Sequence, residues 1–147
     1  MRLRAHHLLC LYGFRGLGYD SRFVATVFRV IDGLKDNPQT MIEITNSGDF
    51  ICASCPHYSE DGCHKNGHRS EASVRRTDDR VMEKINIVPE TTIKAEEVFR
   101  KIDAAIAPED LDDICEGCEW LHHGYCVEGL KTKRESPWLQ RWEMGIR

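Results

Sequence analysis

The sequence predicts an α+β, mainly helical fold: a small metal-stabilised domain of two pseudo-repeated halves, each a helix followed by a cysteine triplet, with one short β-hairpin. The first reason is a C-x2-C-x7-C spacing that occurs twice and uses six of the seven cysteines. These are Cys52, Cys55 and Cys63, and then Cys115, Cys118 and Cys126. The second reason is a helical segment before each triplet, where FRVID at 28–32 and FRKID at 99–103 agree at four of five positions. Repeated spacing and repeated helix together predict a duplicated unit.

Composition sets the class of protein. A chain of 147 residues, 41% apolar and 30% charged, can bury one hydrophobic core. We expect one cysteine-rich domain over 1–130, with pseudo-repeats at about 20–67 and 91–130, and a basic, Trp-containing tail over 131–147. The net charge of -4 argues against a general nucleic-acid binder. No apolar run approaches the roughly 18 residues that span a bilayer, and the N-terminus lacks a signal-peptide core, which predicts a cytoplasmic protein without a membrane partner.

The first half alternates strand and helix patterns. Residues 1–14 predict a short strand that runs into a helical turn, where His7 and Cys10 share a face and could both be additional ligands of one metal site. From 21 to 36 apolar residues recur at steps of three and four, with an N-cap at Asp20 or Ser21, which predicts a core helix. Residues 41–45 alternate as a strand, and we expect them to form a hairpin with 50–51 that leads into the first triplet.

The second half predicts further helices. Residues 77–79 (TDD) have cap chemistry, so we expect a short helix to begin there and to bury Val81, Met82 and Ile85. Thr92 is the expected cap of the next helix, whose apolar stripe runs from Ile93 to Ile106. Pro108 is expected to open a turn of helix immediately before the second triplet.

The triplets predict a metal centre. In a reducing compartment paired C-x2-C motifs favour metal binding over disulfides. Three cysteines with a remote fourth are typical of an iron-sulfur cluster, and Cys10 could complete one triplet. A 4Fe-4S cluster is favoured over a 2Fe-2S cluster. The alternative is zinc, with each triplet closed by a histidine in a Cys3His site. The candidates are His57, His64 or His68 in the first half and His122 or His123 in the second. Spacing alone does not separate one shared site from two.

An enzymatic role would use the N-terminal segment. His6 or His7 could act as a base for Cys10 as nucleophile, because a thiol needs a nearby base or positive charge to ionise at neutral pH. No acyl-transfer or phosphoryl-transfer motif accompanies these residues, so the sequence predicts no catalytic residue.

Three segments also carry a resemblance to a family. The opening RLRAHHLLCLYGFRGLGY, the CASCP segment and the CEGCEW segment resemble DUF1284, a family of small prokaryotic proteins, over roughly residues 2–130. The resemblance implies iron and sulfur binding and supplies no reaction. We therefore expect an iron-sulfur protein that acts in electron transfer or redox sensing with a redox partner protein. A structural zinc module that mediates a protein interaction is the alternative.

Overall fold

The structure is a computed structural model that describes residues 1–131, so nearly all of the expected tail lies outside the described residues. The strands are β1 (Arg2–Arg4), β2 (Met41–Thr45), β3 (Tyr58–Ser59), β4 (Gly62–Cys63) and β5 (Thr91–Lys94). The α-helices are α1 (Ala5–Gly13), α2 (Ser21–Asp36), α3 (Ser70–Ile85), α4 (Ala95–Ala105), α5 (Leu111–Ile114) and α6 (Tyr125–Lys131). Short 3-10 helices cover Cys52–Ser54, Pro108–Asp110 and Leu121–His123. The mixed, mainly helical class is confirmed.

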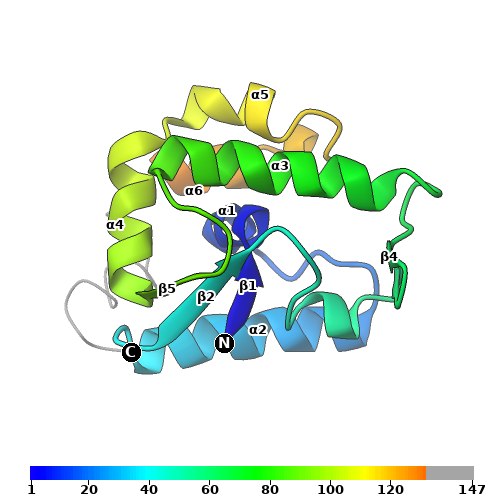
Figure 1. The fold of residues 1–147 in the computed structure, drawn as a ribbon, viewed down its shortest axis with the longest axis horizontal. Coiled ribbons are helices and arrows are strands. Elements are labelled where there is room, and N and C mark those ends of the chain that lie inside the picture. Colours follow the sequence, from blue (N-terminus) through cyan, green and yellow to red (C-terminus); the bar gives the residue numbers. More distant parts are fainter. Residues whose placement is uncertain (132–147) are drawn as a thin grey trace.

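A three-stranded sheet in the order β1-β2-β5 lies at the centre, with α2 on one side and α3 on the other (Figure 1). β1 runs parallel to β2, and β5 runs antiparallel to it. Ile42 and Ile44 on β2 are fully buried, because both side chains project from the same face of the sheet into the hydrophobic core. α1 continues directly from β1 and packs against α3 and α6, which places the N-terminal segment in the middle of the molecule.

Several local predictions are confirmed. The strand at the N-terminus runs into α1, and α2 begins where the Asp20 side chain accepts a hydrogen bond from the backbone N–H of Phe23 at 2.8 Å. Pro108 occupies the first turn of a 3-10 helix that leads into α5. Each of these features depends on residues close together in the chain.

The strand over 41–45 exists, but its expected pairing is wrong. β2 pairs with β1 and β5, and residues 50–51 form no strand. The short hairpin is instead β3–β4, which lies inside the first triplet and ends at Cys63. The apolar alternation of β2 predicts a strand correctly, whereas its partners are set by segments 40 or more residues away.

Two expected helix starts are also wrong. α3 runs without interruption through 77–79, and Asp78 is buried inside it rather than capping an end. Thr92 belongs to β5, and α4 begins after Lys94. Asp78 tolerates a helix interior because its carboxylate pairs with a buried arginine, as described below.

The two matched pentapeptides lie in α2 and α4. Ile31 and Ile102 are buried in both helices, but Phe28 is 47% exposed whereas Phe99 is 3% exposed. The chain then continues to a strand after α2 and to a 3-10 helix after α4. Duplication of the helix-plus-triplet unit stays a prediction.

None of the helices within residues 1–131 combines the length and the apolar character needed to cross a membrane.

Candidate metal centre

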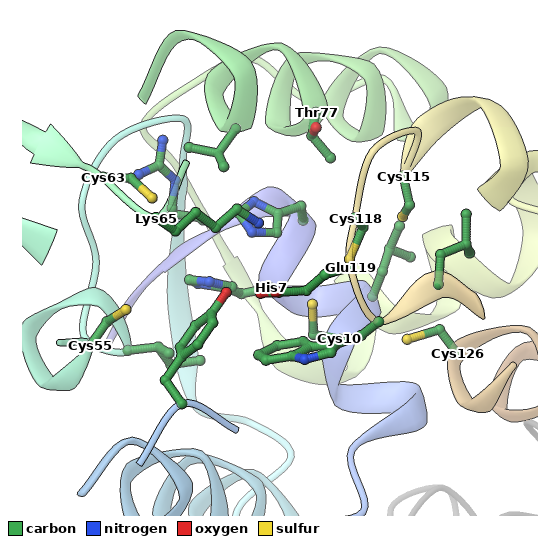
Figure 2. Close-up of a pocket in the computed structure, with 18 of the residues that line it drawn as sticks. His7, Cys10, Cys55, Cys63, Lys65, Thr77, Cys115, Cys118, Glu119 and Cys126 are labelled. Carbon is green, nitrogen blue, oxygen red and sulfur yellow. The ribbon is translucent and has the colours of Figure 1, made fainter. Parts of the chain in front are cut away.

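One cavity of about 260 Å³ collects the cysteines of the whole chain (Figure 2). Its lining includes all seven: Cys10, Cys52, Cys55, Cys63, Cys115, Cys118 and Cys126. They are free thiols and come from α1, from the two triplets and from α6. In Figure 2, Cys55 and Cys63 lie on one side, and Cys10 lies with the second triplet on the other.

Cys10 joins the second triplet because α1 and α6 approach closely. A Cβ built on Gly13 would lie 2.5 Å from the backbone nitrogen of Cys126, and one built on Gly129 would collide with the carbonyl oxygen of Tyr12. Two glycines on facing helices therefore remove the side chains that would hold the backbones apart. No pattern in the sequence indicated this contact, since the two helices lie near opposite ends of the described chain.

Three thiols of this group, Cys10, Cys115 and Cys126, have a raised pKa. Burial raises the pKa of Cys10, and the thiols of Cys126, Cys118 and Cys115 raise it further. Burial and the neighbouring thiols raise the pKa of Cys115 to about 12, and burial and Cys118 raise that of Cys126 to about 11. A nearby cationic centre is what would let such thiols ionise together. The raised pKa also makes Cys10 a poor nucleophile at neutral pH.

The first triplet is arranged differently. Cys52 begins the 3-10 helix, Cys55 follows its last residue, and Cys63 lies on β4. The cysteine whose charge acts on Cys55 is Cys63, whereas Cys52 is influenced by Asp49 and Arg4. The triplet is therefore a pair of thiols plus one thiol that faces a charged network.

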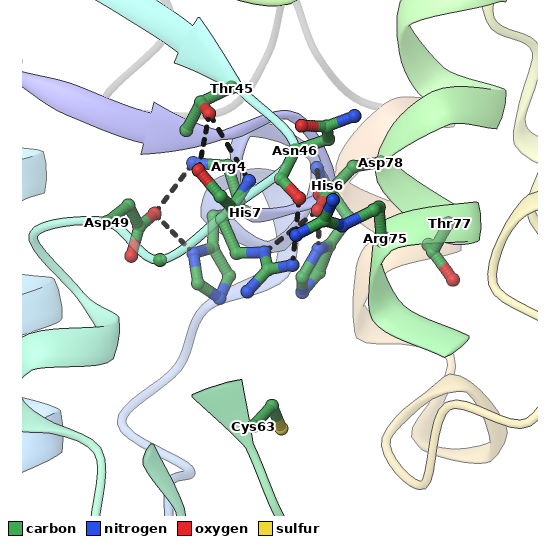
Figure 3. A network of polar contacts seen from close by, with 12 residues as sticks. Arg4, His6, His7, Thr45, Asn46, Asp49, Cys63, Arg75, Thr77 and Asp78 are labelled. Carbon is green, nitrogen blue, oxygen red and sulfur yellow. Dashed lines mark hydrogen bonds and ion pairs between the residues drawn. The ribbon is translucent and has the colours of Figure 1, made fainter. Parts of the chain in front are cut away.

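That network is built around Arg4, whose side chain is 1% exposed. Its Nε donates to Asp78 at 2.8 Å (Figure 3). Its terminal nitrogens donate to Glu71 at 2.7 and 3.0 Å. Glu71 also accepts a hydrogen bond from the backbone N–H of Cys63 at 3.0 Å. Arg4 thus fixes the hairpin of the first triplet to α3 and β1. Sequence reasoning missed it.

Two histidines enter the same network. His6 Nδ1 lies 2.6 Å from Asp78, and His7 Nδ1 lies 2.6 Å from Asp49. Burial raises the pKa of both carboxyls, but His6 and Arg4 outweigh it at Asp78, and His7 with two backbone amides outweighs it at Asp49, so both carboxyls titrate below their usual range. Burial lowers the pKa of His6.

The histidines near the triplets lie elsewhere. His64, His68, His122 and His123 are exposed, and His57 packs against the Tyr19 ring with ring centroids 4.6 Å apart. None of these five is among the described residues that line the cysteine cavity. The imidazoles that line the cavity are His6 and His7. Of these, His7 was a predicted ligand because it shares a helical face with Cys10.

Aromatic and basic side chains complete the lining. Tyr19 and Trp120 pack with ring centroids 4.9 Å apart, and both line the cavity, as does Lys65. The Lys65 charge favours the thiolate forms of Cys10 and Cys55. The Lys65 side chain lies between the two sets of cysteines and acts on a thiol in each (Figure 2).

One of the comparisons with known proteins identifies a family for the chain. The family described as "Protein of unknown function (DUF1284)" matches residues 18–124, which include the first cysteine triplet and Cys115 and Cys118 of the second but not Cys126. No curated protein and no solved structure matches the chain. With nearly three quarters of its length matched, the chain belongs to the DUF1284 family.

Proposed function

We propose that this protein binds an iron-sulfur cluster, with Cys10, Cys115, Cys118 and Cys126 as the ligands of one cluster. The observation that carries the proposal is the convergence of all seven cysteines on one cavity, with Cys10 beside the second triplet. This arrangement supplies a fourth thiol for a triplet that lacks one. Four thiols are the ligand set that such clusters prefer.

The spacing of the thiols supports a cluster over a single zinc ion. With Zn–S bonds of about 2.3 Å, four sulfurs around one ion lie about 3.8 Å apart. Within residues 1–131, the one group of three ligand atoms that all lie within 4.8 Å of one another is His7, Asp49 and Cys52. The four thiols are therefore spread more widely than the shell of one ion. In a cluster each thiolate binds a different iron, which suits the wider spacing.

The protein's own groups would hold and protect this centre. Lys65 offsets negative charge on the thiolates, and the Tyr19–Trp120 pair covers part of the cavity with apolar surface. Cys52, Cys55 and Cys63 remain candidate ligands of a second centre. A cluster supplies one-electron transfer, at a potential between about -700 and +450 mV depending on its surroundings. The role proposed is electron transfer or redox sensing with a redox partner protein, by one cysteine-rich domain over 1–130.

The test is iron, zinc and acid-labile sulfide analysis of anaerobically purified full-length protein, with electron paramagnetic resonance of the dithionite-reduced sample. We expect iron and sulfide in about equal amounts. Cys10→Ser and Cys118→Ser should each lower both. Ser73→Ala is the matched control, since Ser73 lines the same cavity but carries no thiol, and it should leave both unchanged.

Two results would contradict the proposal. Protein free of iron and sulfide would exclude it, and zinc without sulfide would establish the structural zinc module in its place. Retention of the full sulfide content by Cys10→Ser would reject Cys10 as the fourth ligand.

A further inference from the structure

His7, Asp49 and Cys52 form a group of three side chains that the proposed cluster does not use. A ring nitrogen of His7, a carboxylate oxygen of Asp49 and Cys52 Sγ all lie within 4.8 Å of one another. His7 and Cys52 line the cysteine cavity, and Asp49 is buried. A thiol, an imidazole and a carboxylate in contact are the parts of a nucleophile, its general base and the group that orients the base. In a free enzyme such contacts are often longer than a hydrogen bond and shorten when substrate binds.

Asp49 fixes the orientation and the tautomer of the His7 ring. One Asp49 oxygen lies 2.6 Å from His7 Nδ1 (Figure 3). The carboxylate also accepts the backbone N–H groups of Arg4 and Cys52, each at 2.7 Å. Burial raises the pKa of Asp49, but His7 and these two amides outweigh it, so Asp49 is ionised. Because a carboxylate only accepts, the proton of the neutral imidazole lies on Nδ1, and the lone pair on Nε2 is free to take a proton.

The Cys52 thiol also lies beside a buried cation. Arg4 Nη1 donates to Cys52 Sγ at 4.0 Å and to a Glu71 carboxylate oxygen at 3.0 Å. Burial and the Asp49 charge raise the pKa of Cys52 and Arg4 lowers it, and the raised value means that the resting thiol keeps its proton. Such a thiol reacts as the serine of a catalytic triad does, by giving its proton to the imidazole as it attacks. The guanidinium can then stabilise the negative charge that develops beside the sulfur.

The cavity next to Cys52 determines the class of substrate. Its lining includes the aromatic rings of Tyr19, Phe23 and Trp120, and the centroids of the Tyr19 and Trp120 rings lie 4.9 Å apart. Ile51, which precedes Cys52 in the chain, also lines it. Concave sites with mainly apolar walls and a few convergent polar groups bind small organic molecules. A small apolar acyl group therefore suits this cavity.

We propose that Cys52 is a nucleophile for acyl transfer from a small apolar ester or thioester, with His7 as its general base and Asp49 as the residue that orients His7. Cys52 Sγ bonds to the carbonyl carbon while His7 takes the thiol proton. The bond from that carbon to the leaving oxygen or sulfur then breaks, and the leaving group takes the proton from His7. Water gives a proton to His7 and attacks the acyl-cysteine, which releases the acid and returns the proton to Cys52. This activity does not involve the cluster, so the inference goes beyond the proposed function.

The test uses p-nitrophenyl acetate with the full-length, anaerobically purified protein. Mass spectrometry of acid-quenched samples locates the acetyl group, and absorbance follows p-nitrophenol release. We expect acetylation of Cys52, which Cys52→Ala should abolish. His7→Ala should slow acetylation about 100- to 10,000-fold, and added imidazole should restore part of the rate, which a purely structural role of His7 would not allow. Asp49→Asn, which no longer fixes the tautomer, should slow it by up to about 10,000-fold. Circular dichroism checks that each variant folds.

The chain contains two matched controls. His122, like His7, is next to a second histidine, but it is exposed and outside this cavity. His122→Gln should leave acetylation of Cys52 unchanged. Within the wild-type protein, buried Cys52 should be acetylated before Cys55, which is more exposed. The reverse order overturns the inference even where a variant fails to fold, and so does a folded His7→Ala protein that reacts at the wild-type rate.

The two proposals can fail separately. Cys118→Ser should lose acid-labile sulfide yet keep acetylation of Cys52, because Cys118 takes no part in this reaction. Wild-type protein that is acetylated at Cys52 but contains no sulfide rejects the cluster and supports the nucleophile. Protein that contains sulfide but is not acetylated at Cys52 rejects the nucleophile and supports the cluster.

Discussion

The two triplets have the same spacing and different surroundings. Cys10 lies beside the second, because α1 and α6 are in close contact. The first is divided between a pair, Cys55 and Cys63, and a single thiol, Cys52, that faces Arg4 and Asp49. Spacing determines which thiols can share a centre, but the elements packed around them determine which other groups join. Equal spacing therefore does not imply equal centres.

The largest expected effect comes from removing the arginine that supports only the first triplet. Arg4→Leu removes the guanidinium that pairs with the buried Asp78 carboxylate, and breaking a buried pair in this way costs about 3–5 kcal/mol of unfolding free energy. Urea denaturation followed by circular dichroism measures it. Arg100→Leu is the control: its ion pair with Glu96 is exposed and spans 3.9 Å, so it should cost less than about 0.5 kcal/mol. Equal costs for the two variants would show that the Arg4 network does not stabilise the fold.

The next effect concerns the second triplet. Gly129→Ala places a methyl group against the Tyr12 carbonyl oxygen. To relieve this clash α6 must move away from α1, which should lower the free energy of unfolding by about 1–3 kcal/mol. Because that movement separates Cys126 from Cys10, sulfide content should fall as well. Gly33→Ala in α2 has open space around its Cβ and should instead stabilise by up to about 1 kcal/mol. Urea denaturation and sulfide analysis of both variants test this. Unchanged sulfide content in Gly129→Ala would show that the contact between α1 and α6 is not needed for cluster binding.

A smaller difference separates the turns of the two triplets. Gly62 and Gly117 both have positive φ, at 107° and 82°, which a side chain tolerates poorly. An alanine Cβ at Gly62 would also press on Glu71, at 2.7 Å from its Cγ, whereas the space at Gly117 is open. Each alanine variant should lose roughly 1–2 kcal/mol from backbone strain, with the larger loss at Gly62. Equal melting temperatures for the two variants would show that the contact with Glu71 adds nothing to the loss of stability at Gly62.

Mild acid should have the smallest effect on stability, through the charged network beside the first triplet. A histidine whose folded pKa is lowered contributes stability that is present above its unfolded pKa of about 6.5 and is lost as pH falls. Burial lowers the pKa of His6, so stability should fall between pH 7 and 5 by at most about 1.4 kcal/mol per pH unit. Below about pH 4 the carboxyls of Asp49 and Asp78, whose pKa values are lowered, should add a steeper loss.

This pH dependence is measured by urea denaturation with a chelator present, so that protons do not compete with a metal. His6→Gln should flatten the curve between pH 7 and 5, and His122→Gln should not. A wild-type curve that is flat over this range would contradict the buried, neutral state of His6.

The sequence could predict what depends on neighbouring residues. The cap at Asp20, the periodicity of α2, the alternation of β2 and the proline before α5 are local, and all appear in the fold. The error at 77–79 had a physical cause. Asp78 has the side chain of a cap, but a charge partner 74 residues away holds it inside α3. Patterns among neighbouring residues cannot predict a charge partner so far away in the chain.

The candidate site could likewise be predicted only where it depends on local patterns in the sequence. Six of the seven cavity cysteines follow from their spacing, and His7 with Cys10 follows from helical periodicity. Arg4, Asp49 and Asp78 could not be predicted as part of the site, because tertiary pairing alone gives them a role. The fourth thiol of the second triplet depended on Gly13 and Gly129, which look unremarkable in the sequence.

Helix α1 places Cys10 beside the thiols of the second triplet and His6 and His7 in the charged network around Arg4. Its partners arise much later in synthesis, since Asp78 lies near the middle of the chain and Cys126 near the end of the described part. During synthesis, the N-terminal segment therefore cannot complete these contacts until nearly the whole domain has been made. We expect metal loading to follow completion of the chain, and a truncation before α6 to leave exposed thiols without a metal.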